Sequence, residues 1–237
     1  MTQEVRQRNV PAAAKPTEQS TTETILTSLW DRFVEHDYNL SFYFALMCRL
    51  DKSTWTYFFL HAFTKICEIF GSGVPTLTIT ILWMLFCDCS FTCALLFNIS
   101  VSHLVDVAGQ FSIKGIVKRA RPNYNSGPMF FCHGVDNYSF PSGHCSRMAM
   151  FCYLTCILLD AHHYWVEQYV AVLIYTIIGL SRVFMGRHYC SDLVGGILLG
   201  VAEGWICWHY LWVSADNLHY LNICKSYFNM SFLWSPR

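Results

Sequence analysis

Apolar residues follow one another in five long runs after residue 72, and polar residues gather between those runs. The runs lack the alternation of apolar and polar positions that marks a membrane β-strand. Inside a bilayer, a helix satisfies its own backbone hydrogen bonds without closing a barrel. The pattern therefore predicts an all-α, multi-pass transmembrane helical bundle of about six helices, of which five or six span the membrane. The five runs cover residues 74–86, 91–117, 143–160, 168–186 and 190–213.

The chain before these runs is more polar. Residues 1–22 lack the apolar core of a signal peptide and predict a disordered polar tail. The apolar stretch 54–70 contains a histidine, a lysine and a glutamate, which favours a helix at the interface or partly buried over a full span. After the tail we therefore expect an N-terminal helical segment at 23–53, a membrane domain at 54–213 and a C-terminal tail at 214–237.

Composition supports lipid as part of the solvent. Hydrophobic residues make up 54% of the chain and charged residues 14%, against about 25% charged residues in soluble domains. The formal net charge is zero, which argues against a nucleic-acid partner. Most of the twelve cysteines lie in apolar runs and act there as small hydrophobic residues. A disulfide among Cys132, Cys145 and Cys190 stays open.

The first of three polar segments that indicate chemistry ends the 91–117 run. Lys114 and Arg121 are seven residues apart, which places both on one face of a helix, and Pro122 then ends that helix. Two cations on one face at a helix end can bind a multiply charged anion. Taken alone, however, this segment more readily indicates a basic cluster that contacts anionic lipid headgroups.

The second segment is Pro141-Ser142-Gly143-His144, directly before an apolar run. Ser142 is suited to cap the helix, and Gly143 lets its backbone approach a ligand closely. Free amides at a helix N-terminus attract anions, and His144 would lie beside the anion. An ordinary capped helix start with an interfacial histidine explains the segment equally well.

The third segment runs from Ser181 to Asp192. His188 and Asp192 are four residues apart and are neighbours on a helix surface. A carboxylate at one ring nitrogen fixes the tautomer and leaves the other nitrogen free to attack. Arg182 offers a planar guanidinium suited to phosphate oxygens. An ordinary His–Asp pair at the start of the last helix is the alternative.

Topology strengthens the three segments together. If each run crosses the membrane once, the 143–160 run leaves the face reached at Arg121 and the 168–186 run returns to it. All three segments then meet at one face, and they predict a shared anion site.

These residues resemble the type 2 phosphatidic acid phosphatase superfamily. Its signature has Lys-x6-Arg-Pro, then Pro-Ser-Gly-His, then Ser-Arg-x5-His-x3-Asp, and every position is present here in that order. The match covers roughly residues 54–212. Within the superfamily, Asn137 to His144 and Leu180 to His188 look like the animal presqualene (polyisoprenoid) diphosphate phosphatase group.

The resemblance implies three catalytic residues. His188 attacks phosphorus and becomes phosphohistidine, Asp192 orients His188, and His144 protonates the leaving oxygen and then activates water. It also implies that the phosphoryl oxygens are bound by Lys114, Arg121 and Arg182 with the backbone amides of Ser142 and Gly143. No metal and no cofactor are expected, because the cations neutralise the phosphate charge.

The implied function is metal-independent hydrolysis of a polyisoprenoid diphosphate in the membrane. The implied location is the endoplasmic reticulum and nuclear envelope, with the site on the lumenal side. Phosphatidic acid, lysophosphatidic acid and sphingoid phosphates are the alternative substrates. A non-catalytic scaffold that keeps the fold is the alternative function, although His144, His188 and Asp192 are all intact. A homo-oligomeric state stays open.

Two further patterns lie in the spans. Ser102, Asp106, Gln110 and Lys114 recur every four residues as a polar stripe. The stripe fits a headgroup path, a channel or transporter lining, or hydrogen bonding between helices, and the last reading is at least as well supported as the others. Glycines at 196, 200 and 204 predict a close helix contact.

Overall fold

The computed structural model describes residues 18–46, 50–87, 90–124, 137–160 and 163–214. Residues 1–17 and 215–237 of the expected tails lie outside these residues, as does Cys132, whereas residues 18–22, expected in the disordered tail, are helical. The chain divides into two units, residues 1–37 and residues 38–237. In the first unit, the described residues belong to helix α1 (Glu18–Phe44), which continues into the second unit.

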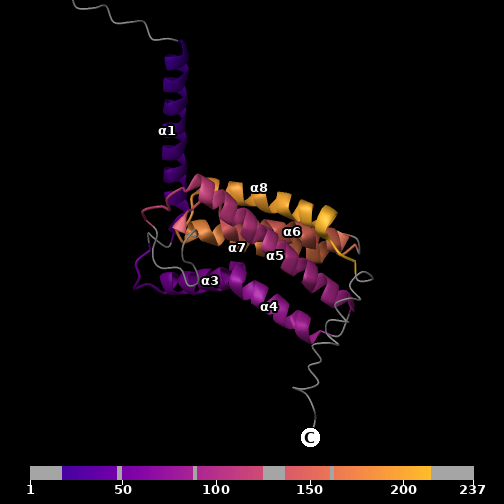
Figure 1. Cartoon of the computed structure of the whole chain (residues 1–237). Coiled ribbons are helices and arrows are strands. Elements are labelled where there is room, and N and C mark those ends of the chain that lie inside the picture. Colours follow the sequence, from indigo (N-terminus) through magenta and orange to yellow (C-terminus); the bar gives the residue numbers. More distant parts are fainter. Residues whose placement is uncertain (1–17, 47–49, 88–89, 125–136, 161–162, 215–237) are drawn as a thin grey trace, which may run out of the picture. The chain divides into compact units, whose positions relative to one another are not determined.

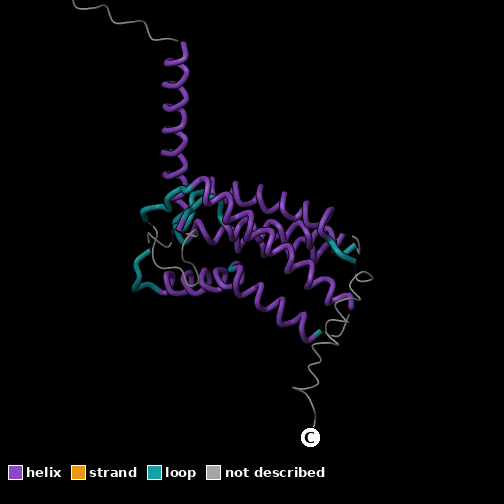
Figure 2. The backbone as a smooth tube through the Cα atoms, viewed as in Figure 1, coloured by secondary structure: helices purple, strands orange, loops and turns teal. Residues whose placement is uncertain are grey.

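The second unit is a bundle of helices joined by loops, and the described residues include no strand (Figure 2). This confirms the all-α fold class. Helix α6 (Gly143–Asp160) lies in the middle of the bundle and packs against α5, α7 and α8 (Figure 1). The helices of the bundle are α3 (Trp55–Gly71), α4 (Gly73–Phe86), α5 (Ser90–Val117), α6, α7 (Trp165–Phe184), and α8 (Cys190–Ile206) with the π-helical turn η2 (Cys207–Leu211).

Three described helices are long and apolar enough to cross a membrane by themselves, namely those at 91–117, 165–184 and 190–211. Helices α3 and α4 meet at a 54° bend at Ser72 and would count as a fourth span together. This count is lower than the five or six spans that we expected. The 54–70 and 74–86 runs form one bent pair rather than two spans, and α6 carries polar residues that face its neighbours, such as Ser146 and Arg147.

The interior of the bundle is polar and its surface is apolar. Buried residues include many charged and hydroxyl side chains, whereas large apolar side chains of α7, such as Val166, Tyr169 and Leu173, are exposed. This distribution fits a surface in contact with lipid, where burial of apolar groups brings no gain over exposure.

The predicted close helix contact lies between α6 and α8. A Cβ atom placed on Gly200 would lie 2.0 Å from the carbonyl oxygen of Ser146 and 2.9 Å from the amide nitrogen of Met150. Both neighbours are backbone atoms and cannot turn away. The absence of a side chain at Gly200 therefore permits the close approach of α8 to α6. This approach brings the second signature segment, at the start of α6, next to the end of the third, at the start of α8.

Candidate active site

The three signature segments meet where α5 ends, α6 begins and α7 is connected to α8. The amide of Ser139 donates to the carbonyl of Arg119 at 2.8 Å, and the amide of Ser142 donates to the carbonyl of Asp192 at 3.0 Å. These bonds tie the chain before α6 to the end of the first segment and to the start of α8. The structure thus brings the predicted site residues to one end of the bundle.

His188 is buried, and both of its ring nitrogens face named groups. Its Nδ1 lies 2.8 Å from the carbonyl oxygen of Ser139 and 3.5 Å from Asp192 Oδ2. A carbonyl oxygen only accepts hydrogen bonds, so Nδ1 carries the hydrogen and Nε2 of the neutral ring keeps its lone pair. Nε2 lies 3.4 Å from Arg121 Nη1. The ring therefore presents a nucleophilic nitrogen toward a guanidinium.

The Ser139 carbonyl was not anticipated from the sequence. We expected Asp192 to fix the tautomer of His188, but the Ser139 oxygen is closer to Nδ1. Asp192 is fully buried, and its carboxylate accepts from Arg119 Nη1 at 2.7 Å and from the Tyr189 amide at 2.9 Å. Asp192 thus has a cation and a helix-capping amide as its nearest partners, and it acts on His188 at longer range.

Arg119 is a second residue that sequence reasoning gave no role. Its guanidinium lies 3.9 Å from the centre of the Tyr189 ring and donates to Ser191 Oγ at 2.6 Å, in addition to Asp192. It therefore connects the end of the first segment to the first turn of α8. Four basic residues lie within 114–121, and this cluster indicated that some of them have a functional role. The sequence did not show which of them would bind phosphate and which would pair with Asp192.

His144 lies in the first turn of α6 and faces α3. Its Nε2 is 3.2 Å from the carbonyl oxygen of Glu68. A Cβ atom on Gly71 would lie 2.3 Å from His144 Cδ2, so the imidazole packs directly on the α3 backbone. Helix α3, which the sequence predicted to lie at the interface or to be partly buried, is therefore part of this site.

The start of α6 differs in one respect from the expectation. The backbone amide of Ser142 donates to Asp192, so it is not available to a phosphoryl oxygen in this structure. The Ser142 hydroxyl is fully buried, and the thiol of Cys145 is its neighbour. Gly143, as predicted, begins the helix. At this helix start the hydroxyl of Ser142, rather than its amide, can bind an anion.

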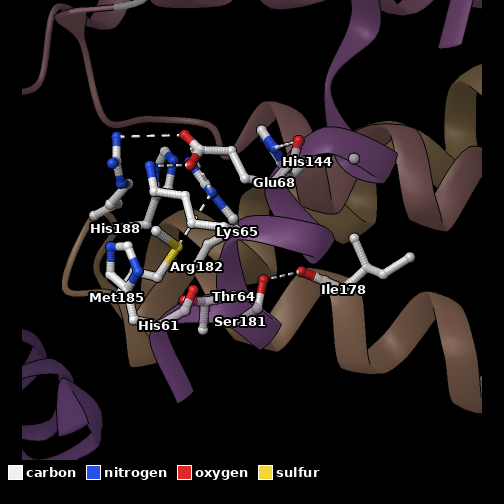
Figure 3. Close-up of polar contacts among 12 residues, drawn as sticks. His61, Thr64, Lys65, Glu68, His144, Ile178, Ser181, Arg182, Met185 and His188 are labelled. Atoms are coloured by element: carbon white, nitrogen blue, oxygen red, sulfur yellow. Dashed lines mark hydrogen bonds and ion pairs between the residues drawn. The ribbon is translucent and has the colours of Figure 1, made fainter. Parts of the chain in front are cut away.

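The cations of the site are deeply buried. Lys114 lies in the last turn of α5 and is 4% exposed, and Arg182 lies in the last turn of α7 and is 1% exposed. Arg187, next to His188, is 3% exposed and was not predicted. Figure 3 shows the Glu68 carboxylate of α3 between Lys65 and Arg182. The site thus combines buried cations with a carboxylate that sequence analysis did not include.

The polar stripe of α5 has a different use. Asp106 pairs with Arg147 Nη2 at 2.5 Å and accepts from Ser146 Oγ at 2.8 Å, both on α6. Ser146 Oγ also lies 3.0 Å from Glu203 Oε2 on α8. These contacts join three helices, so Asp106 serves hydrogen bonding between helices, as the alternative reading of the stripe expected. Among the described residues, no group of three His, Cys, Asp or Glu side chains is arranged to hold a metal ion.

An apolar groove of about 720 Å³ runs along α6 between α7 and α8. Cys145, Gly179 and Leu193 line it near the signature segments, and Asp160 and Gln168 line it at the opposite end of α6. Cys145 belongs to a small apolar cluster against which Cys190 packs, and both are free thiols here. A groove of this length and polarity matches an extended hydrocarbon chain better than a polar ligand.

Comparisons with known proteins give a consistent result. Among curated proteins, the probable lipid phosphate phosphatase beta of Arabidopsis thaliana is 30% identical over 128 residues, covering 42% of this chain and 57% of the relative. Phosphatidylglycerophosphatase B of Bacillus subtilis (strain 168) is 30% identical over 95 residues, covering 38% and 44%. The chain thus spans about half the length of the curated relatives it matches.

A solved structure shares the fold. The crystal structure of a transmembrane PAP2-type phosphatidylglycerolphosphate phosphatase from Bacillus subtilis has a TM-score of 0.54, with 20% sequence identity over 76% of this chain and 86% of that chain. The PAP2 superfamily model matches residues 89–216, which are 128 of the 237 residues and contain all three signature segments. The resemblance to the superfamily is thereby confirmed, whereas the narrower presqualene group stays a prediction: this chain belongs to the PAP2 superfamily.

Proposed function

We propose that this protein is a membrane lipid phosphatase that hydrolyses a polyisoprenoid diphosphate through a phosphohistidine at His188, without a metal ion. The observation that carries the proposal is the geometry of His188. Its Nδ1 is held by the Ser139 carbonyl at 2.8 Å, which leaves Nε2 as the nucleophile, 3.4 Å from the guanidinium of Arg121. A nucleophile beside a cation is suited to attack a negatively charged phosphoryl group.

In the first step, the lone pair of His188 Nε2 attacks phosphorus and the bond from phosphorus to the leaving oxygen breaks. His144 gives its ring proton to that oxygen. The positive charge that develops on the His188 ring is stabilised by the buried carboxylate of Asp192, 3.5 Å from Nδ1. For a diphosphate substrate, the leaving group is the lipid monophosphate.

In the second step, His144 takes a proton from a water molecule, whose oxygen attacks the phosphorus of the phosphohistidine. The bond from phosphorus to Nε2 breaks, and inorganic phosphate leaves with His188 in its neutral form. Lys114, Arg121 and Arg182 bind the phosphoryl oxygens in both steps, and the Ser142 hydroxyl donates to one of them. These positive charges take the part that a magnesium ion plays in other phosphoryl transfers.

A lipid substrate is supported by the apolar groove and by the names of two relatives. The groove begins at Cys145, next to His144, so a phosphate at His188 would place its hydrocarbon chain along α6. A groove of this kind suits an extended hydrocarbon chain such as that of a polyisoprenoid diphosphate. Lysophosphatidic acid, sphingoid phosphates and phosphatidic acid also have such chains, and they are the second candidates.

The resemblance supports a location in the endoplasmic reticulum and nuclear envelope, with the site on the lumenal side. A cysteine introduced at exposed Asn137, two residues before Ser139, should react with an impermeant thiol reagent only after the membrane is opened. In intact microsomes, which enclose the lumenal face, we therefore expect no labelling. Labelling without opening would place the site on the cytosolic side.

The decisive experiment is phosphate release by the purified full-length chain in excess EDTA. The substrates are farnesyl diphosphate, phosphatidic acid, lysophosphatidic acid and sphingosine phosphate. We expect phosphate release to be fastest from the diphosphate, and we expect His188→Ala to abolish phosphate release. His103→Gln is the matched control, because His103 is equally buried but packs on Phe151. Equal activity of His188→Ala and wild type would refute the mechanism, and activity restored only by magnesium would refute metal independence.

A further inference from the structure

Glu68 is a buried acidic residue among the cations of the proposed phosphate site. Its Oε1 lies 3.7 Å from Arg187 Nη1. The same oxygen lies 4.0 Å from Arg182 Nη1, and Oε2 lies 2.8 Å from Lys65 Nζ (Figure 3). Glu68 is 5% exposed, and the two arginines are 3% and 1% exposed. Buried charges are costly unless they are paired, so Glu68 serves these arginines as a counterion.

A phosphoryl group that enters the site must use the same guanidinium groups. Arg182 is one of the signature cations, and its Nη1 already lies within ion-pair distance of the carboxylate. Two anions beside one guanidinium repel each other. The bound anion must therefore outcompete the Glu68 carboxylate, and a doubly charged anion does so better than a singly charged one.

We propose that Glu68 is a specificity-determining residue that acts as a charge filter: it admits doubly charged phosphomonoesters and diphosphates to the arginine site and excludes singly charged phosphodiesters. The inference rests on the proposed function. A bilayer is composed largely of phosphodiester lipids, whose headgroups offer the same oxygens with one negative charge. A phosphomonoester carries about 1.5 to 2 negative charges at pH 7. Without an internal anion, these abundant headgroups would occupy the site.

The backbone of Glu68 also contacts His144, the proposed general acid. Its carbonyl oxygen lies 3.2 Å from His144 Nε2 and accepts the ring hydrogen. While this bond is made, that hydrogen is not available to a leaving oxygen. The residue whose carboxylate faces the arginines therefore also holds His144 through its backbone carbonyl.

The test compares Glu68→Gln with wild type, using purified full-length protein in mixed micelles. Phosphate release is measured against two inhibitors, phosphatidylglycerol as a phosphodiester and inorganic phosphate as the product, in a buffer above the second pKa of phosphate so that it is a dianion. We expect the inhibition constant for phosphatidylglycerol to fall at least about tenfold in Glu68→Gln, and that for phosphate to fall less. An unchanged ratio of the two constants would overturn the proposal, because a merely structural role of Glu68 would not alter charge selectivity.

Two further variants serve as a control and as an alternative to Glu68→Gln. Glu167→Gln removes an exposed carboxylate at the start of α7 and should leave the ratio unchanged. If Glu68→Gln fails to fold, Glu68→Asp withdraws the carboxylate from the arginines by one methylene group. This variant should lower the ratio of the inhibition constant for phosphatidylglycerol to that for phosphate at least about threefold. An unchanged ratio would equally overturn the filter.

Failure of the filter and failure of the proposed function are distinguishable. If wild type releases no phosphate from any lipid, the proposed function fails. The same two anions are then compared by direct calorimetric binding to wild type and Glu68→Gln. Equal binding ratios would overturn the filter, and a lower ratio in the variant would support it in a protein without phosphatase activity.

Discussion

Removing Arg147 tests how the bundle holds the site together. Arg147 is 6% exposed, pairs with fully buried Asp106 at 2.5 Å, and donates from Nη1 to the carbonyl of Gly71 at 2.8 Å. That carbonyl lies at the bend between α3 and α4. The guanidinium therefore connects the buried cluster to the helix that positions His144.

The magnitude follows from these contacts. Arg147→Leu leaves the Asp106 carboxylate without a cation, which costs about 3–5 kcal/mol for a buried pair. It also leaves the Gly71 carbonyl without its donor, at about 1–3 kcal/mol. We expect a loss of about 5 kcal/mol, or roughly 10–20 °C in the midpoint of thermal unfolding.

The double variant Arg147→Leu, Asp106→Leu separates the two contributions. It removes the orphaned charge, so the loss relative to wild type should fall to about 1–3 kcal/mol, leaving the Gly71 carbonyl as the main cost. Thermal unfolding of the full chain in one detergent, followed by tryptophan fluorescence, measures all variants. Additive losses, with the double variant less stable than either single variant, would refute the pairing.

Three further predictions concern the site and its surroundings. Asp192→Asn should lower kcat by about 10- to 100-fold, well short of the roughly 10⁴-fold loss seen where the aspartate alone fixes the tautomer, because the Ser139 carbonyl holds Nδ1. Gly200→Ala should destabilise the chain by about 1–3 kcal/mol through its clash with α6 backbone, whereas Gly115→Ala, with no atom within 4 Å of the new Cβ, should stay within about 1 kcal/mol of wild type. Ala149→Trp should fill the groove and raise KM about tenfold for a long-chain lipid phosphate, with little effect on a short-chain, water-soluble phosphate.

Each of these has an opposite outcome that would be informative. A loss of 10⁴-fold in Asp192→Asn, by the precedent of the catalytic triad, would mean that the aspartate and not the carbonyl fixes the ring. Equal stability of the two glycine variants would mean that α6 and α8 are less close than described. A KM increase that is the same for both phosphates would place the hydrocarbon chain outside the groove. The measurements are steady-state phosphate release and thermal unfolding.

The sequence was informative for several properties that depend on residue type and spacing. It predicted the helical fold class, the two ends of α6 and the meeting of three polar segments at one face. Two expectations from spacing were wrong. Lys114 and Arg121 do not share a helix, because α5 ends at Val117. His188 lies before α8, which begins at Cys190.

The sequence did not predict the Ser139 carbonyl, because every residue has a carbonyl and only the fold brings this one to His188. Nor did it predict Glu68, which lies 46 residues before Lys114 on a helix whose apolar pattern indicated an interface. The packing of α3 on α6 and α7 is tertiary and leaves no local pattern.

The number of spans was overestimated for a related reason. Hydropathy treats 54–70 and 74–86 as independent runs, but Ser72 joins them at a bend. The carbonyl of Gly71, the last residue of α3, accepts a hydrogen bond from Arg147 at this bend. A helix can end inside a protein when a neighbouring side chain satisfies its carbonyls. Side chains from other helices thus decide whether two apolar runs form two spans or one bent pair.

The walls of the groove along α6 include Leu180, Ile197 and Val201, each more than a third exposed on the outer surface of the bundle. A ligand chain held there would contact the surrounding lipid or detergent as well as the protein. Substrate would then arrive by diffusion in two dimensions, and the reaction rate would follow its mole fraction in the micelle rather than its molarity. Diluting the substrate with inert detergent at constant bulk concentration should therefore slow turnover, as expected for surface dilution.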